Sequence, residues 1–224
     1  MSYLSKNYEM KNMALLVCMV LFCSATKPLS KVLIIGDSIS LGYTPYVIKD
    51  LTDKAVVSHS PGNSESTTTG IKKIESWLGD QHWDLIIFNW GLWDLCYRSS
   101  GSKVTGKRDK ISGKLSTTLD DYRKNLEFLV QRLQKASPHL IFVTTTFVPP
   151  NEEGRFAGDE DKYNAVAREV MKKYNVQIND LNKLSHKVHP KFGMGSDNVH
   201  YNASGYERLS KQITASIKKQ LKIK

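Results

Sequence analysis

Three short segments of the chain combine residue types that suit nucleophilic catalysis. They are Gly36-Asp37-Ser38, Phe88-Asn89-Trp90-Gly91-Leu92-Trp93-Asp94 and Asp197-Asn198-Val199-His200. A serine hydroxyl is a weak nucleophile until a base removes its proton, and a histidine base needs a third group to fix its tautomer. Ser38 can be the nucleophile and His200 the base, and the carboxylate of Asp197, three residues earlier on a turn, can reach the imidazole ring. The sequence therefore predicts a catalytic triad of Ser38, His200 and Asp197.

Each segment also has an ordinary structural explanation when it is taken alone. Gly-Asp-Ser can cap a helix, a glycine followed by an acid can form a plain turn after a strand, and a single histidine on a loop is usually solvated. The triad hypothesis therefore depends on the segments occurring together.

The helices and strands that must position these residues can be predicted from the sequence. After Lys31, short apolar runs alternate with segments whose apolar residues recur at helical spacing. This alternation predicts an α/β fold with a parallel sheet. Strands are expected over residues 32–35, 55–58, 85–89, 140–145 and 176–179. Helices are expected around residues 71–78, 122–133, 163–174 and 206–217, and Ser38 is expected at a strand-to-helix turn. Ligands bind beyond the carboxyl ends of parallel strands, which is where the candidate segments fall.

Together these segments resemble the sequence blocks of the SGNH (GDSL-like) hydrolases. Residues 32–42 are similar to the first block, residues 88–94 occupy the place of the third, and residues 197–200 followed by Gly205-Tyr206 are similar to the last. Order and spacing agree from Lys31 to about Leu209. The resemblance implies a three-layer αβα sandwich with a five-stranded parallel sheet, the flavodoxin-like SGNH hydrolase fold. It also implies a serine esterase that cleaves lipid acyl esters or sugar O-acetyl esters through an acyl-enzyme on Ser38, with no cofactor and no metal.

Two departures from the family pattern concern the groups that hold the oxyanion. The third block usually reads Gly-x-Asn-Asp, but here Gly91 and Asp94 flank Trp93, whose indole can donate a hydrogen bond but is far larger than the family's asparagine. Loss of such a donor costs roughly 2.7 to 4 kcal/mol where it has been tested. In the second block Gly62 is the expected amide donor, and Asn63 or the Ser64 amide could serve instead.

These departures keep a second function open, a catalytically weak or inactive binding protein in which Trp90 and Tyr97 could stack on a sugar. In the ordinary explanation, the Ser/Thr-rich loop around Gly62 only caps the helix that starts near Gly70. The stretch from residue 97 to 118 either covers the site or is a plain surface insertion. Loops tolerate insertions at little cost in stability, which favours the second interpretation.

Composition is typical of one globular domain, with 224 residues, 40% of them hydrophobic, and a formal net charge of +10. Much of the positive charge lies in residues 103–114 and 211–224, both expected to be solvated. Neither run has the interleaved aromatic residues or fold signature of a nucleic-acid-binding protein, so no nucleic-acid partner is expected. A third function, binding of anionic polymers or lipid headgroups by this surface, ranks last because exposed lysines already explain the charge.

The N-terminus is typical of a signal peptide. Lys11 is followed by an apolar run over residues 14–23 and by the small residues Cys23-Ser24-Ala25. The run is shorter than the roughly 20 residues that span a bilayer, so a membrane anchor is the weaker alternative, and lipid anchoring through Cys23 is another. The sequence predicts a leader over residues 1–25, one hydrolase domain over residues 26–224, a secreted or periplasmic protein and no stable membrane insertion. Cys96 would be the one cysteine left, expected as a small buried residue.

Overall fold

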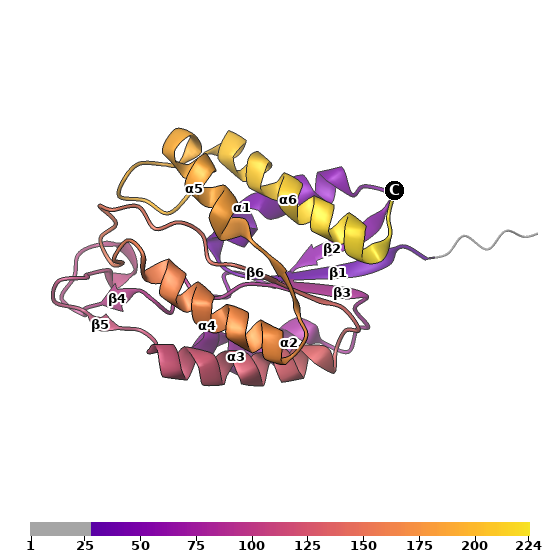
Figure 1. The fold of residues 1–224 in the computed structure, drawn as a ribbon, viewed down its shortest axis with the longest axis horizontal. Coiled ribbons are helices and arrows are strands. Elements are labelled where there is room, and N and C mark those ends of the chain that lie inside the picture. The colour runs from indigo at the N-terminus through magenta and orange to yellow at the C-terminus, as the bar shows by residue number, and fades with distance from the viewer. Residues whose placement is uncertain (1–27) are drawn as a thin grey trace, which may run out of the picture.

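A five-stranded parallel sheet forms the centre of the molecule (Figure 1). The computed structural model describes residues 28–224, so the predicted leader lies outside the described residues. The strands are β1 (Ser30–Ile35), β2 (Ala55–His59), β3 (Leu85–Phe88), β6 (Leu140–Val143) and β7 (Gln177–Asn179), in the order β2-β1-β3-β6-β7. All five expected strands are confirmed. β3 and β6 end one or two residues earlier than expected, because the chain turns there into loops of the candidate site.

Helices cover both faces of the sheet and complete the expected three-layer sandwich. One face carries α1 (Ser38–Asp50), α5 (Leu181–Phe192) and α6 (Ala203–Leu221), and the other carries α2 (Thr67–Leu78), α3 (Leu119–Gln134) and α4 (Asp159–Lys173), as Figure 1 shows. The four helices expected from periodicity and the helix expected after the Ser38 turn are all present. Within residues 28–224, no helix is both long and apolar enough to cross a membrane.

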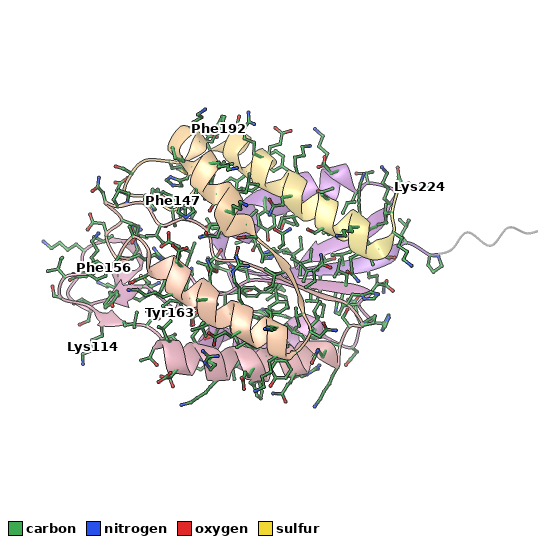
Figure 2. The ribbon with its side chains drawn as sticks, in the orientation of Figure 1. Lys114, Phe147, Phe156, Tyr163, Phe192 and Lys224 are labelled. Atoms are coloured by element: carbon green, nitrogen blue, oxygen red, sulfur yellow. The ribbon has the colours of Figure 1, made fainter. Side chains whose placement is uncertain are left out.

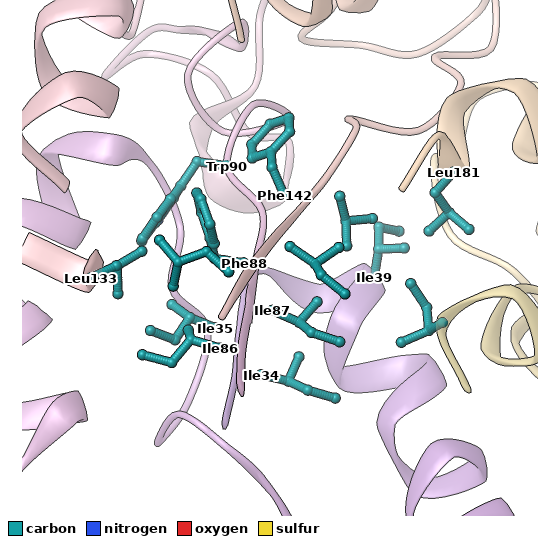
Figure 3. Close-up of a cluster of buried hydrophobic side chains, with 14 of the residues drawn as sticks. Ile34, Ile35, Ile39, Ile86, Ile87, Phe88, Trp90, Leu133, Phe142 and Leu181 are labelled. Carbon is teal, nitrogen blue, oxygen red and sulfur yellow. The ribbon is translucent and has the colours of Figure 1, made fainter. Parts of the chain in front are cut away.

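Side chains of each strand alternate between the two layers of the core. Ile34 and Ile87 point to the side of Ile39 and Leu181, whereas Phe88 points to the opposite side (Figure 3). Strands buried on both faces need apolar residues at every position, which is why β1, β3 and β6 read as unbroken apolar runs. Cys96 is also fully buried, as expected for a small apolar residue.

The segment after β3 forms a small substructure at the end of the molecule where the parallel strands finish (Figure 1). In this segment β4 (Tyr97–Arg98) pairs antiparallel with β5 (Lys114–Leu115), and a 3-10 turn, η1 (Thr105–Lys107), lies between them. Phe147, Phe156 and Lys114 lie at the same end of the molecule (Figure 2).

This segment is fixed to the loop that follows β6. The amide of Tyr97 donates to the Gly154 carbonyl at 2.7 Å, and the amide of Lys110 donates to the Glu153 carbonyl at 2.8 Å. The Phe156 ring meets the Tyr97 ring edge-on, with centroids 5.3 Å apart. Two loops that are distant in sequence therefore form one wall at the carboxyl edge of the sheet.

Candidate active site

Ser38 is the first residue of α1, directly beyond the carboxyl end of β1. Asp37 caps the helix, since its Oδ1 accepts from the Ile39 amide at 2.9 Å. The first amides of a helix have no partner within the helix, and the helix dipole makes this end positive. Gly36 leaves room for the turn, because a Cβ there would lie 2.7 Å from Ser40 Oγ. The local sequence thus places the Ser38 hydroxyl among donors suited to a developing negative charge.

His200 meets Ser38 across the pocket. The distance from Ser38 Oγ to His200 Nε2 is 2.8 Å, although the two residues are 162 positions apart in the chain. The loop that carries His200 is held on both sides, because the His200 carbonyl accepts from the Met194 amide and Asn202 caps the following helix α6. The structure brings together the two residues predicted as nucleophile and base.

The group beside His200 Nδ1 is Asn198 and not Asp197, which corrects the predicted geometry. Asn198 Oδ1 lies 2.6 Å from His200 Nδ1 and also accepts from the His200 backbone amide at 3.0 Å. The Asp197 side chain is exposed beside Gly195 and makes no hydrogen bond to His200 in the part of the chain that is described. The turn directs these adjacent side chains differently, so the residue two positions before the histidine reaches the ring.

Asn198 also fixes which imidazole nitrogen carries the proton. A backbone amide can only donate, so the Asn198 atom that accepts from it must be the oxygen. The same oxygen faces Nδ1, which therefore carries a hydrogen and leaves the lone pair of Nε2 for the Ser38 hydroxyl. This is the tautomer that a general base requires.

The surroundings of His200 favour its neutral form. Burial lowers the pKa of His200 below its ordinary value of 6.5, and the nearby charges of Arg155 and Arg108 lower it further against the opposing effect of Glu152. A neutral imidazole can accept the serine proton, so His200 is ready to act as a base at neutral pH.

The pocket around Ser38 and His200 has a volume of about 250 Å³. It is lined by Asp37, Ser38, Asn63, Leu92, Trp93, Arg98, Thr105, Gly106, Arg108, Arg155, Asn198, Val199 and His200. Two of the predicted oxyanion or substrate residues, Asn63 and Trp93, are therefore at the site. Gly62 is exposed in a turn with a φ of 72° and does not line the pocket.

The other two predicted residues of the third block are structural, which is a second correction. Asp94 is fully buried away from the pocket and holds the start of α2, accepting from the Thr67 amide at 3.0 Å and from Thr67 Oγ1 at 2.6 Å. Burial raises the pKa of Asp94 to about 7. Gly91 allows close packing, because a Cβ there would lie 1.9 Å from Thr145 Oγ1.

Three pocket arginines were not predicted from the sequence. Arg98 and Arg108 come from the segment between residues 97 and 118, and Arg155 comes from the loop after β6. The expectation that residues 97–118 are a plain surface insertion is therefore wrong, because this segment forms part of the pocket wall. Arg108 stands in the lysine-rich run of residues 103–114, which looks solvated as a whole, and Arg98 and Arg155 stand in polar loops, so the only sequence signal was the arginines themselves. Within residues 28–224, no group of three or more His, Cys, Asp or Glu is placed to share a metal ion.

Comparisons with known proteins agree with this fold. A model of the GDSL-like lipase/acylhydrolase family matches residues 34–208. The acetylxylan esterase Axe2 from Geobacillus stearothermophilus is similar with a TM-score of 0.67 and 19% identity over 84% of this chain and 94% of that chain. A lipase/acylhydrolase from Enterococcus faecalis gives a TM-score of 0.69 and 20% identity over 88% and 98%. The acetyl xylan esterase AlAXEase gives 0.66 and 19% over 84% and 99%. A comparison with curated protein sequences finds no match.

Proposed function

Because the chain belongs to the GDSL-like lipase/acylhydrolase family and is a carboxylic ester hydrolase, we propose that Ser38 is its nucleophile and His200 its general base. The observation that carries this proposal is the 2.8 Å contact between Ser38 Oγ and His200 Nε2 in a pocket at the start of α1. Separations of about 2.6 to 3.2 Å suit proton transfer between a nucleophile and its base.

The reaction follows from this arrangement. His200 takes the proton of Ser38 as the hydroxyl oxygen attacks the carbonyl carbon of the ester, and it then gives the proton to the departing alcohol. Water attacks the resulting acyl-enzyme with His200 again as the base, which releases the acid and restores the serine. Asn198 is the third group, which orients His200. It supplies an amide in place of the usual carboxylate, as in the Cys-His-Asn arrangement of some proteases.

Backbone amides at the start of α1 are the first source of oxyanion donors, and Trp93 is a further candidate. Trp93 lines the pocket, and its indole N–H makes no hydrogen bond within residues 28–224. Trp93→Phe keeps an aromatic ring but removes the donor. If the indole holds the oxyanion, this change should lower kcat by about 10²-fold with little effect on KM, as for the loss of one oxyanion donor elsewhere.

The size of the pocket supports a small acyl group. A volume of about 250 Å³ lies below the roughly 300 to 1,000 Å³ of sites for drug-sized ligands. Two of the similar structures are acetylxylan esterases, which supports O-acetyl groups on sugars as a substrate class ahead of long lipid acyl chains. Export through the predicted leader over residues 1–25 is part of the proposal and is carried by the sequence alone.

The neighbouring Ser40 offers a matched control for the nucleophile. Ser40 lies on the same helix as Ser38, and its Oγ lies 2.7 Å from Nε2 of His59 at the end of β2. Ser40 therefore belongs to a second serine–histidine pair, but it is buried and does not line the pocket. Labelling with a fluorophosphonate probe and hydrolysis of 4-nitrophenyl acetate should both be lost in Ser38→Ala and retained in Ser40→Ala. Labelling that survives in Ser38→Ala refutes the assignment, and a wild-type protein with neither labelling nor turnover would be a binding protein.

A further inference from the structure

The pocket that holds Ser38 carries more guanidinium groups than carboxylates. Glu152 is fully buried, and one of its oxygens accepts from both Arg108 Nη1 at 2.5 Å and Arg155 Nη1 at 2.8 Å. Its other oxygen accepts from the Gly154 amide at 2.8 Å. The single negative charge of Glu152 is therefore shared between two arginines behind the pocket wall.

Arg98 adds a third positive charge without a carboxylate of its own. Its guanidinium lies over the Trp93 ring, 4.4 Å from the centroid, and its Nη1 donates to the Gly106 carbonyl. Within residues 28–224 no carboxylate lies at ion-pair distance from Arg98. Stacking on an indole and bonding to a carbonyl hold the planar group in place without neutralising its charge. Glu65 attracts Arg98 only from beyond ion-pair distance, and its carboxylate accepts from Thr69 Oγ1 at 2.9 Å.

The remaining charges of the pocket do not cancel this excess. Asp37 is the one acidic residue in the lining, its side chain is 1% exposed, and its Oδ2 has no partner in the described part of the chain. Burial raises the pKa of Asp37, which weakens it as a counter-charge. His200 is neutral at neutral pH for the reasons given above. With every acid ionised, the three guanidinium groups have only the carboxylates of Asp37 and Glu152 in or directly behind the pocket wall, and Glu65 lies beyond ion-pair distance of Arg98.

We infer that the ester cleaved at Ser38 carries an anionic group, a carboxylate or a phosphate-type oxyanion, which Arg98 and Arg108 bind. This inference rests on the proposed function, since it names the substrate class of the same pocket. An excess positive charge in a partly buried pocket is costly unless an anion compensates it, and arginine forks match carboxylates and phosphates with two parallel hydrogen bonds. The anion would lie against the wall formed by residues 98–108 while the ester carbonyl lies at Ser38.

Three matched esters test this inference. They are 4-(carboxymethyl)phenyl acetate, 4-(phosphonomethyl)phenyl acetate and the neutral amide 4-(carbamoylmethyl)phenyl acetate, which have similar shape and leaving group. The wild-type enzyme should have a kcat/KM at least about tenfold higher for one of the anionic esters than for the amide, the worth of one hydrogen-bonded charge. The better of the two anionic esters separates a carboxylate site from a phosphate site.

Arginine substitutions test which residue causes the preference for an anionic ester. Arg98→Gln should lower the ratio of anionic to neutral kcat/KM by about tenfold, and Arg98→Lys, which keeps the charge without the fork, should lower it less. Arg132 is the control, because it pairs with Glu75 on the surface between α3 and α2 at 2.6 Å, away from the pocket. Arg132→Gln should leave the ratio unchanged. Circular dichroism of each variant confirms folding.

Binding to Ser38→Ala separates this inference from the proposed function. If the wild-type enzyme cleaves the amide ester as fast as both anionic esters, or if Arg98→Gln leaves the ratio unchanged, the inference is overturned while the esterase proposal stands. If no ester is cleaved, titration calorimetry of Ser38→Ala decides: tighter binding of an anionic ester than of the amide supports the anion site without catalysis, and equal binding overturns it.

Discussion

The contact between Asn198 and His200 gives the most discriminating prediction, because sequence and structure differ there. Asn198→Ala removes two hydrogen bonds, one to His200 Nδ1 at 2.6 Å and one to the His200 amide at 3.0 Å. Neutral hydrogen bonds contribute about 0.5 to 1.5 kcal/mol each, so their loss costs about 1 to 3 kcal/mol in total. If these hydrogen bonds orient the imidazole and this orientation matters only in the transition state, kcat should fall about 5- to 150-fold with KM little changed.

Asp197→Ala is the matched control, since Asp197 is adjacent in the chain, exposed and not bonded to His200. It should change kcat by less than about twofold, because it removes no group that contacts His200, and a surface substitution usually changes stability by no more than about 0.5 kcal/mol. Asn198→Asp should keep activity and move the acid limb of the pH–rate profile to higher pH, because a carboxylate beside the ring raises the pKa of His200. Steady-state hydrolysis of 4-nitrophenyl acetate between pH 5 and 9 measures all three variants.

One pattern of results would refute this reasoning. A loss of 100-fold or more in Asp197→Ala, together with a loss below twofold in Asn198→Ala, would mean that the aspartate orients the imidazole in the working enzyme. Such a result would restore the Ser38–His200–Asp197 triad that the sequence predicts.

Three further predictions concern pH and packing. The acid limb of kcat/KM should lie below pH 6.5, because burial and two pocket arginines lower the pKa of His200, so the base is lost only as pH falls through that lowered value; a limb above pH 6.5 would contradict this. The folded-state pKa of Asp94, about 7, exceeds its ordinary value of 3.8, so the stability that it contributes is lost as pH rises through about 7. Asp94→Asn should therefore gain stability relative to wild type between pH 4 and 8 in urea titrations, and a constant difference would count against it. Gly42→Ala should destabilise the fold by about 1 to 3 kcal/mol, because its Cβ would lie 2.2 Å from the Tyr206 ring, whereas Gly101→Ala should stay near wild type.

The sheet and the serine–histidine pair could be predicted because simple periodicity and strand ends determine them. Strands buried on both faces leave unbroken apolar runs, and residues at the carboxyl ends of parallel strands converge on one edge. Helix α5 was not predicted, since its apolar stripe of Leu181, Leu184 and Val188 is short and Pro190 interrupts the pattern. The choice between Asp197 and Asn198 depends on the backbone angles of a turn, which a spacing of two or three residues does not determine.

The arginine-rich wall could not be predicted because it depends on two loops meeting in space. Glu152 stands in the polar run Pro150-Asn151-Glu152-Glu153-Gly154, which looks like an exposed turn, yet the Glu152 side chain is fully buried. The Glu152 side chain is buried because the segment around Arg108 packs against it. Asp94 was placed in the site for a similar reason, since an acid after a strand can face a ligand or cap the next helix, and only the position of α2 decides.

The pairing of these two loops has a consequence for how such enzymes can be recombined. The backbone contacts of Tyr97 with Gly154 and of Lys110 with Glu153, together with the ion pair of Arg108 and Glu152, join the two segments into one unit. A chimera that imports residues 97–118 from a relative without its matching 150–155 loop would leave the Glu152 carboxylate with only Arg155 as a charged partner in a water-excluded place. An experiment that transfers substrate selectivity between such proteins should therefore exchange residues 97–118 and residues 150–155 together and leave the sheet unchanged.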